Sequence, residues 1–380
     1  MARLGDTGKI ITGNTPKTSE ALNYSSNDIC FVKPSDILDG EITVITDSEF
    51  YISNHARDKA RILPPKSVLV TCIGIIGKVA INNVECAFNQ QINAIVPDTT
   101  KCLTEYLAYA IQNKQIEMQD IANAPVVPIL NKTQFSEIEI QLPSVESQAE
   151  VVKKMRAVDV LISLRKQQLS KLDELVKSRF IELFGDVANT PKYSGVPLGT
   201  ICATLSGGTP TTKIPEYYQG NIPWISTPYL GNNHINGSSA KAYITEDAIK
   251  NSATHLIPAN TIMFGIRVGV GKSSIIDEPM CANQDIVALM GIDTNKYNLL
   301  FVKHVLDGYQ SHFDSIKKGA TILGITTDDL KKVMIPVVGM ELQSQFATFV
   351  EQTDKSKFEI QKSLEKLETL KKALMQKYFR

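Results

Sequence analysis

The chain contains the same series of motifs twice, and this internal duplication restricts the possible folds more than any other feature. Residues 4–184 align with residues 198–379 at offsets of 193 to 195 residues. Seven pairs of segments recur in the same order: Leu4–Gly5 with Leu198–Gly199, Thr12–Pro16 with Ser206–Pro210, Ile29–Val32 with Ile222–Ile225, Leu63–Pro65 with Leu256–Pro258, Ile76–Lys78 with Val270–Lys272, Asn89–Ile92 with Asn283–Ile286, and Glu146 and Gln148 with Glu341 and Gln343. A repeat of this length indicates two copies of one structural unit.

The first part of each repeat has the pattern of a small mixed α/β domain. Short β-branched and apolar runs between turn residues predict strands. These runs are Val68–Thr71, Lys78–Ile81, Ile92–Val96, Thr261–Phe264 and Ile286–Leu289. Apolar residues spaced three and four apart between Val302 and Ile316 predict a helical stretch.

The second part of each repeat has the pattern of a long helix. Apolar residues in alternating steps of four and three form a heptad seam, which is typical of a coiled coil. We expect the two helices to pack against each other through Ile162, Leu169, Leu172, Val176, Leu183, Ile360, Leu364, Leu367 and Leu374. Gly185 follows the first helix, as glycine often does at a helix end.

The predicted fold class is therefore α+β, with two pseudo-repeated α/β domains joined by two long helices that form an antiparallel coiled coil. The expected boundaries are residues 1–144 for the first domain, 145–185 for its helix, 186–197 for a linker, 198–339 for the second domain and 340–380 for the C-terminal helix.

Composition excludes several classes of protein. The chain has 40 basic and 40 acidic residues, so overall charge alone does not indicate a nucleic-acid binder. The six cysteines are scattered without metal-ligand spacing, which favours reduced, buried thiols and no metal site. No apolar run reaches the roughly 18 residues of a membrane span, so we expect a cytoplasmic protein. No catalytic motif is evident.

The order of the motifs resembles the specificity subunit of type I restriction-modification enzymes over nearly the whole chain. The resemblance rests on the turn Gly207–Pro210, the aromatic strand start Ile222–Ile225, the Asn-Gln pair after a Gly-Lys turn, the Glu-x-Gln helix start and the helix end Leu183–Asp186. It implies two target-recognition domains, each reading one half of a bipartite double-stranded DNA sequence, with the helices as spacer.

The resemblance also implies partners. Two modification subunits would bind S-adenosylmethionine and methylate adenine N6. Two restriction subunits, which use ATP and Mg²⁺, can join the complex. The chain itself would bind no cofactor and carry no catalytic residue.

Polar and basic residues on the predicted turns and strand ends are the candidates for DNA contact, since such side chains reach phosphates and base edges. They are Thr15, Lys17, Lys33, Ser35, Lys78, Asn89, Gln90, Thr209, Thr211, Lys213, Ser226, Thr227, Tyr229, Arg267, Lys272, Asn283 and Gln284. Asn89, Gln90 and Gln91 in the first copy correspond to Asn283 and Gln284 in the second, and their amides could pair with adenine. Their recurrence favours a shared structural hydrogen bond instead. Arg267 has no basic counterpart in the first copy. The reading of different bases by the two copies would produce such a difference, and so would a solvated surface arginine.

Two alternatives to a DNA reader remain open. Gly269–Ser273 resembles the end of a phosphate-binding P-loop. However, five residues separate Gly265 from the Gly-Lys pair, whereas the P-loop motif has four residues between its first glycine and that pair. A glycine-containing hairpin turn is the favoured interpretation. The second alternative is a coiled-coil scaffold whose two globular ends bind proteins.

Overall fold

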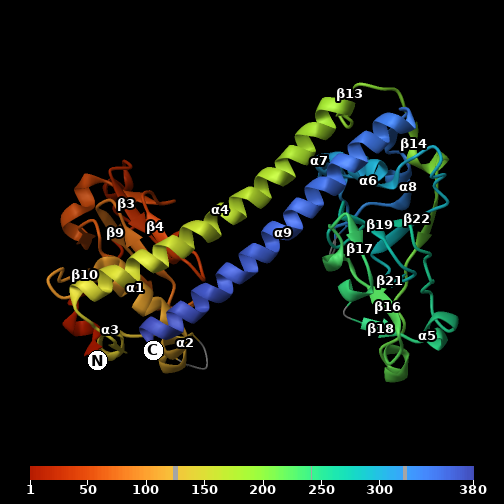
Figure 1. The fold of residues 1–380 in the computed structure, drawn as a ribbon. Coiled ribbons are helices and arrows are strands. Elements are labelled where there is room, and N and C mark those ends of the chain that lie inside the picture. The colour runs from red at the N-terminus through yellow and green to blue at the C-terminus, as the bar shows by residue number, and fades with distance from the viewer. Residues whose placement is uncertain (123–126, 241, 320–322) are drawn as a thin grey trace. The chain divides into compact units, whose positions relative to one another are not determined.

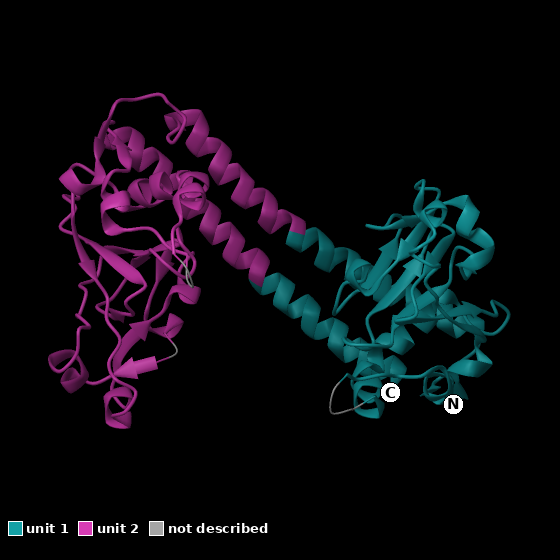
Figure 2. Cartoon of the chain, turned by 180° about the vertical axis from the view of Figure 1, so that it is seen from behind, with its two compact units in different colours: residues 1–166, 362–380 teal, residues 167–361 magenta. Residues whose placement is uncertain are grey.

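The computed structural model describes residues 1–122, 127–240, 242–319 and 323–380, and the chain divides into two compact units (Figures 1 and 2). Unit 1 comprises residues 1–166 and 362–380, and unit 2 comprises residues 167–361. Each unit thus contains one globular domain, the first half of the long helix that follows it, and the second half of the other long helix.

The domain of unit 1 is built on a five-stranded sheet and a smaller four-stranded sheet. The large sheet has the order β2-β10-β7-β8-β4, and its pairs are antiparallel except β4 with β8. Its strands are β2 (Gly8–Thr12), β10 (Ile92–Pro97), β7 (Val68–Thr71), β8 (Val79–Asn82) and β4 (Ile42–Ile45). The small sheet consists of β5 (Tyr51–Ile52), β3 (Ile29–Val32), β9 (Cys86–Phe88) and β6 (Ile62–Leu63).

Both faces of the large sheet are covered, which explains why its strands are continuous apolar runs rather than alternating ones. Val68 and Val70 pack in one cluster with residues of α1, whereas Leu69 packs in a second cluster with residues of the small sheet. The helices of this domain are α1 (Thr104–Asn113), α2 (Gln115–Ile121) and α3 (Lys132–Glu137). Strand β1 (Ala2–Arg3) pairs with β11 (Glu139–Ile140).

The domain of unit 2 repeats this topology strand for strand in its large sheet. The order is β15-β22-β19-β20-β17, again with one parallel pair, β17 with β20. The strands are β15 (Ala203–Ser206), β22 (Ile286–Met290), β19 (Thr261–Gly265), β20 (Ser273–Ile276) and β17 (His234–Ile235). The small sheet has β18 (Ala242–Ile244), β16 (Ile222–Ile225) and β21 (Cys281–Ala282), and β14 (Gly195–Pro197) pairs with β23 (Met334–Pro336). The helices are α5 (Glu246–Lys250), α6 (Leu299–Gly308), α7 (Gln310–Ile316) and α8 (Thr327–Lys331).

The two long helices are α4 (Val145–Phe184) and α9 (Met340–Phe379), each of 40 residues and so about 60 Å long. In unit 1 the start of α4 packs with the end of α9: Met155 and Phe379 share a core cluster, and Lys371 lies 2.7 Å from Asp159. In unit 2 the end of α4 packs with the start of α9, where Phe180 and Phe346 have ring centroids 5.3 Å apart. The helices therefore run antiparallel within each unit.

A buried glutamine attaches each long helix to its domain. Gln148 Oε1 accepts a hydrogen bond from the backbone N of Leu103 (2.8 Å), and Gln148 Nε2 donates to the carbonyls of Lys101 and Pro143. Gln343 makes the same three bonds, to Asn298 N (2.8 Å), Lys296 O (2.9 Å) and Val338 O (2.9 Å). Both side chains are fully buried, so the Glu-x-Gln motif at each helix start has a structural explanation.

Replacing Gln343 with alanine should lower the free energy of unfolding by about 2–4 kcal/mol, because one backbone N–H and two carbonyls lose partners in a buried place. Urea denaturation followed by circular dichroism measures this loss. Gln345→Ala is the matched control, since Gln345 is exposed two residues further along the same helix. Equal stabilities of the two variants would show that the buried bonds do not hold the helix to the domain.

The predicted fold class is confirmed, including the antiparallel helix pair and the hairpin strands. All nine residues of the predicted helix interface are buried or half-buried. The first helix ends at Phe184, and Gly185 has a φ of +80°. The helical stretch at 302–316 is two helices rather than one, because α6 ends at Gly308 and α7 begins at Gln310. The segment expected to be a linker contains the strand pair β12 (Gly185–Asp186) and β13 (Thr190–Pro191), as well as β14.

Candidate nucleic-acid interface

Four loops meet at one end of the large sheet in each unit. In unit 1 they are residues 13–18, 72–78, 89–91 and 127–131, which we call loop cluster 1. They are joined by backbone bonds from Gly13 N to Ile92 O (3.0 Å), Cys72 N to Gln91 O (2.7 Å) and Leu130 N to Cys72 O (2.9 Å).

Loop cluster 2 in unit 2 consists of residues 207–213, 266–272, 283–285 and 323–326. The equivalent bonds run from Gly207 N to Ile286 O (2.9 Å), Ile266 N to Asp285 O (2.8 Å) and Ile325 N to Ile266 O (2.8 Å). The two clusters thus share one backbone framework and differ in the side chains that they present.

The turn after the first strand of each sheet requires glycine because it passes close to another loop. A Cβ on Gly13 would lie 2.1 Å from the carbonyl oxygen of Asn89, and one on Gly207 would lie 2.2 Å from that of Asn283. Two residues after this glycine, an exposed threonine bonds to the neighbouring loop in both units. The hydroxyl of Thr15 donates to Gln90 Oε1 (2.7 Å), and that of Thr209 donates to Gln284 Oε1.

The second position of this turn differs between the copies for a packing reason. A Cβ on Gly208 would lie 2.3 Å from the backbone of Ala253, so no side chain fits there. In unit 1 the neighbouring segment leaves room for Asn14, whose amide donates to Lys59 O (2.8 Å) and whose oxygen accepts from Arg61 N (2.8 Å).

The Gly-Lys turns are hairpin turns. Gly77 and Gly271 have positive φ angles of 84° and 92°, and strands β8 and β20 begin two residues later. A P-loop leads instead into a helix whose N-terminus binds phosphate. The geometry at Lys272 is thus that of the hairpin favoured from the sequence.

Most of the predicted contact residues lie exposed or half-exposed. The exposed ones are Thr15, Lys17, Ser35, Gln90, Thr209, Thr211, Lys213, Arg267, Lys272 and Gln284, while Lys33, Ser226 and Tyr229 are half-buried. The ammonium of Lys78 donates to the carbonyls of Ile37 (2.8 Å) and Pro34 (3.2 Å). The Asn89 amide donates to Gln91 Oε1 (2.9 Å), and that of Asn283 donates to Asp285 Oδ2 (3.2 Å), as expected of structural asparagines. Thr227 is buried.

Two of these predicted contact residues, Lys33 and Arg267, have charged groups that contact neighbouring side chains. The ammonium of Lys33 lies 3.1 Å from the centroid of the Phe50 ring, a cation–π contact. The guanidinium of Arg267 contacts Asp285 Oδ1 through Nε at 3.5 Å. Lys33 and Arg267 are therefore positioned at their loops more firmly than solvated side chains would be.

The sequence did not reveal the exposed apolar residues of the loop clusters. They are Ile75, Val127 and Ile129 in cluster 1 and Val268 and Leu323 in cluster 2, with exposed fractions from 44% to 58%. Their apolar character resembles that of core residues in a sequence. Only the neighbouring turn residues could have indicated exposure: a glycine beside Ile75, Val268 and Leu323, and Pro128 between Val127 and Ile129.

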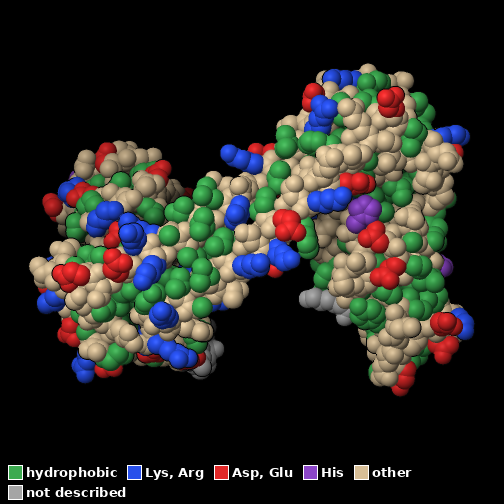
Figure 3. Space-filling view, viewed as in Figure 1, with side chains coloured by type: hydrophobic (Ala, Val, Ile, Leu, Met, Phe, Trp, Pro, Cys, Tyr) green, Lys and Arg blue, Asp and Glu red, His purple; other side chains and the backbone are tan. Residues whose placement is uncertain are grey.

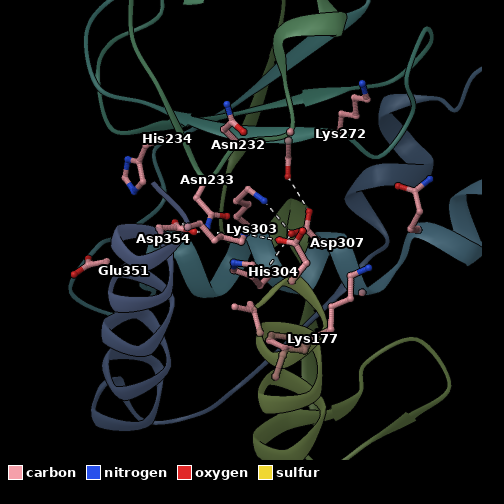
Figure 4. A pocket seen from close by; sticks show the side chains of 18 of the residues that line it. Lys177, Asn232, Asn233, His234, Lys272, Lys303, His304, Asp307, Glu351 and Asp354 are labelled. Carbon is pink, nitrogen blue, oxygen red and sulfur yellow. Dashed lines mark hydrogen bonds and ion pairs between the residues drawn. The ribbon is translucent and has the colours of Figure 1, made fainter. Parts of the chain in front are cut away.

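Unit 2 also contains a cleft of about 1650 Å³ between the end of α4, the start of α9 and the strands β17 and β20 (Figure 4). Lys303 is buried, and its ammonium lies 2.9 Å from Asp307 Oδ2. Burial lowers the pKa of the neighbouring His304 to about 4. Asn233 donates to Asp354 (2.7 Å), and Lys272 lies on the strand side of the cleft. Its lining carries both signs of charge.

Basic and acidic side chains are interspersed on the face drawn in Figure 3. Among the described residues no group of three or more His, Cys, Asp or Glu side chains is arranged to hold a metal ion. No helix in the described part of the chain is long and apolar enough to cross a membrane.

The comparisons with known proteins agree with the resemblance seen in the sequence. The family described as type I restriction modification DNA specificity domain matches residues 1–174 and 192–372. The MjaIX specificity subunit of Methanocaldococcus jannaschii is 31% identical over 174 residues, 44% of this chain and 40% of that protein. The HindI specificity subunit of Haemophilus influenzae is 34% identical over 149 residues, 38% of this chain and 32% of that protein. The matched part is therefore less than half the length of these relatives.

Solved structures show the same fold. The S subunit of a type I restriction-modification system from M. genitalium superposes with a TM-score of 0.58 at 13% identity, covering 100% of this chain and 95% of that chain. A chain from a study of type I R-M complex assembly gives a TM-score of 0.60 at 18% identity, covering 99% and 96%. With two matches that together span most of its length, the chain belongs to the type I restriction modification DNA specificity domain family, of which it carries two copies.

Proposed function

We propose that the chain is the specificity subunit of a type I restriction-modification complex and binds double-stranded DNA at a bipartite target. Each unit would read one half of that target through its loop cluster. The observation that carries this proposal is the pairing of an identical backbone framework with different exposed side chains in clusters 1 and 2. Two readers of different half-sites need such a combination, because phosphate contacts can be shared while base contacts must differ.

The proposed partners are two modification subunits, with two restriction subunits joining them when cleavage occurs. Support comes from large apolar side chains exposed on the long helices, since such side chains commonly mark protein interfaces. They are Val160, Leu161, Leu164 and Leu370 in unit 1 and Leu175, Ile181 and Phe358 in unit 2, exposed by 44% to 65%.

In this proposal the chain selects the site and carries out no chemistry. S-adenosylmethionine and the transfer of its methyl group to adenine N6 would belong to the modification subunits, and ATP and Mg²⁺ to the restriction subunits. The complex would act in the cytoplasm, where host DNA is accessible.

Selection from a random duplex library tests the proposal against a protein-binding scaffold. The chain is mixed with the modification subunit encoded beside it, and bound duplexes are sequenced. We expect enrichment of two short sequence blocks at a fixed separation. A scaffold would enrich no sequence, and that result would refute the proposal.

Lys272→Ala should reduce the salt dependence of binding to the selected duplex. Each phosphate contact contributes about −0.9 to the slope of log K against log salt, so loss of one contact makes the slope shallower by about one. Fluorescence anisotropy at several salt concentrations measures this slope. Lys250→Ala is the control, because Lys250 is exposed at the end of α5, outside the loop cluster. A Lys272→Ala slope equal to that of the control would exclude a phosphate contact at Lys272.

A further inference from the structure

The two loop clusters differ most at one pair of positions that are distant in sequence but adjacent in the fold. The bond from Ile325 N to Ile266 O in unit 2 is the same as that from Leu130 N to Cys72 O in unit 1. Arg267 therefore corresponds to Ile73, and Gly324 corresponds to Ile129. In unit 1 the two isoleucines form an antiparallel bridge, and Ile129 is 51% exposed.

The glycine of unit 2 makes room for the arginine. A Cβ on Gly324 would lie 2.9 Å from Cγ of Arg267 and 2.7 Å from the carbonyl oxygen of Ile266. A larger residue at 324 would thus occupy the space that the stem of Arg267 crosses. Arginine at 267 and glycine at 324 form a matched pair, as the two isoleucines do in unit 1.

Two further groups hold the guanidinium of Arg267. Its Nε lies 3.5 Å from Asp285 Oδ1, and its Nη2 lies 3.5 Å from the carbonyl oxygen of Gln284. Unit 1 has Gln91 at the position of Asp285, so the carboxylate occurs only beside the arginine. Nη1 has no partner among the residues that the structure describes, and 48% of the side chain is exposed.

This arrangement contributes little to stability. An ion pair at the surface, with a half-exposed guanidinium and a contact of 3.5 Å, is weak and loses strength in salt. It does fix the direction of a planar, always charged donor at the edge of the cluster. The N–H groups that remain on Nη1 and Nη2 form a fork. An arginine fork of this kind pairs bidentately with O6 and N7 of guanine in the major groove.

We propose that Arg267, oriented by Asp285 and given space by Gly324, is the side chain with which unit 2 reads a guanine of its half-site. Unit 1 presents Ile73 and Ile129 at the equivalent place and so makes no such contact there. This inference rests on the proposed function, because it names a base that one of the two readers recognises.

The test compares methylated targets. The chain is assembled with its modification subunits, and the methylated sequences of a plasmid library are determined by single-molecule sequencing. Arg267→Ala should lose the requirement for guanine at one position of one half-site, with discrimination there falling by roughly 10- to 100-fold. Every other position, and the target of the Lys250→Ala control, should stay unchanged.

A second variant transfers the contact to unit 1. Ile73→Arg, Gln91→Asp and Ile129→Gly are combined in one chain, and we expect a new guanine requirement at one position of the other half-site. This variant keeps the inference testable if Arg267→Ala does not assemble.

Three results would overturn the inference. First, the sequence methylated by the Arg267→Ala variant could be unchanged at every position. Second, the variant could lose its requirement for an A·T base pair, which contains no guanine. Methylation could also fall equally at all sequences while the salt slope becomes shallower by about one, which indicates a phosphate contact. If neither variant changes a base requirement, Arg267 is not a reader. The absence of any bipartite target for the unaltered chain would instead refute the proposed function.

Discussion

Replacing residues 198–333 with the corresponding segment of a relative changes one half of the recognised sequence and leaves the other half intact. Each loop cluster lies within a single unit, and its side chains are held by residues of that unit. Because the units have separate cores, one can be exchanged while the other folds as before. The new half-site should be that of the donor, with discrimination against the old one of several orders of magnitude when several base contacts change together.

The structure determines where this exchange is cut. Strands β14 and β23 pair with each other, with Val196 opposite Ile335. Cutting at 198 and 333 retains both strands, whereas a cut inside either would separate partners. Sequencing of methylated DNA reads the outcome. A hybrid that kept both original half-sites, or lost both, would contradict independent reading by the two units.

Lengthening both long helices by four residues adds one or two unspecified base pairs between unchanged half-sites. Each helix begins in one unit and ends in the other, so the insertions belong at the unit boundaries, after Lys166 in α4 and after Gln361 in α9. Seam residues near these points, Ile162 and Ile360, are half-buried, whereas Val176 is 5% exposed and belongs to the core of unit 2. Copies of residues 163–166 and 358–361 would serve as inserts.

The expected size follows from helix geometry. Four residues add about 6 Å and rotate the chain beyond them by roughly 40°. A base pair of B-DNA rises about 3.4 Å and turns by about 36°. A four-residue insertion also unwinds a coiled coil locally, so assembly of the variant has to be verified first. As a control, a copy of residues 163–166 inserted after the exposed Asn189 should leave the spacing unchanged, because the β12–β13 turn is outside the helices. An assembled helix variant that retained the original spacing would show that the helices do not set it.

Periodicity and repetition were sufficient to predict the architecture. The seam in residues 340–380, the strand Val68–Thr71 and the glycine turn before Lys78 each follow from local spacing, and each occurs as predicted. The break at Tyr309 was missed because the apolar spacing continues through it, although Gly308 directly before it is a local signal for a helix end.

The roles of individual side chains in the loop clusters were harder to predict. Lys78 resembles a free surface lysine in the sequence, yet its ammonium donates to two carbonyls about 40 residues away along the chain. Arg267 and Gly324 are 57 positions apart, and nothing in their local sequence relates them. Such contacts between residues distant in the sequence become visible only in the folded structure. For this reason the sequence allowed the DNA-contact residues to be proposed as a group but not ranked.

If the two equivalent units of the chain read the two parts of one target, the methylation pattern of cellular DNA should show it. Single-molecule sequencing of DNA from cells that express the chain with its modification subunits measures this pattern. We expect N6-methyladenine at a single motif made of two defined blocks separated by a fixed number of unspecified bases, and its disappearance when the chain is deleted. A continuous motif, or methylation that persists without the chain, would show that the two units do not specify the target.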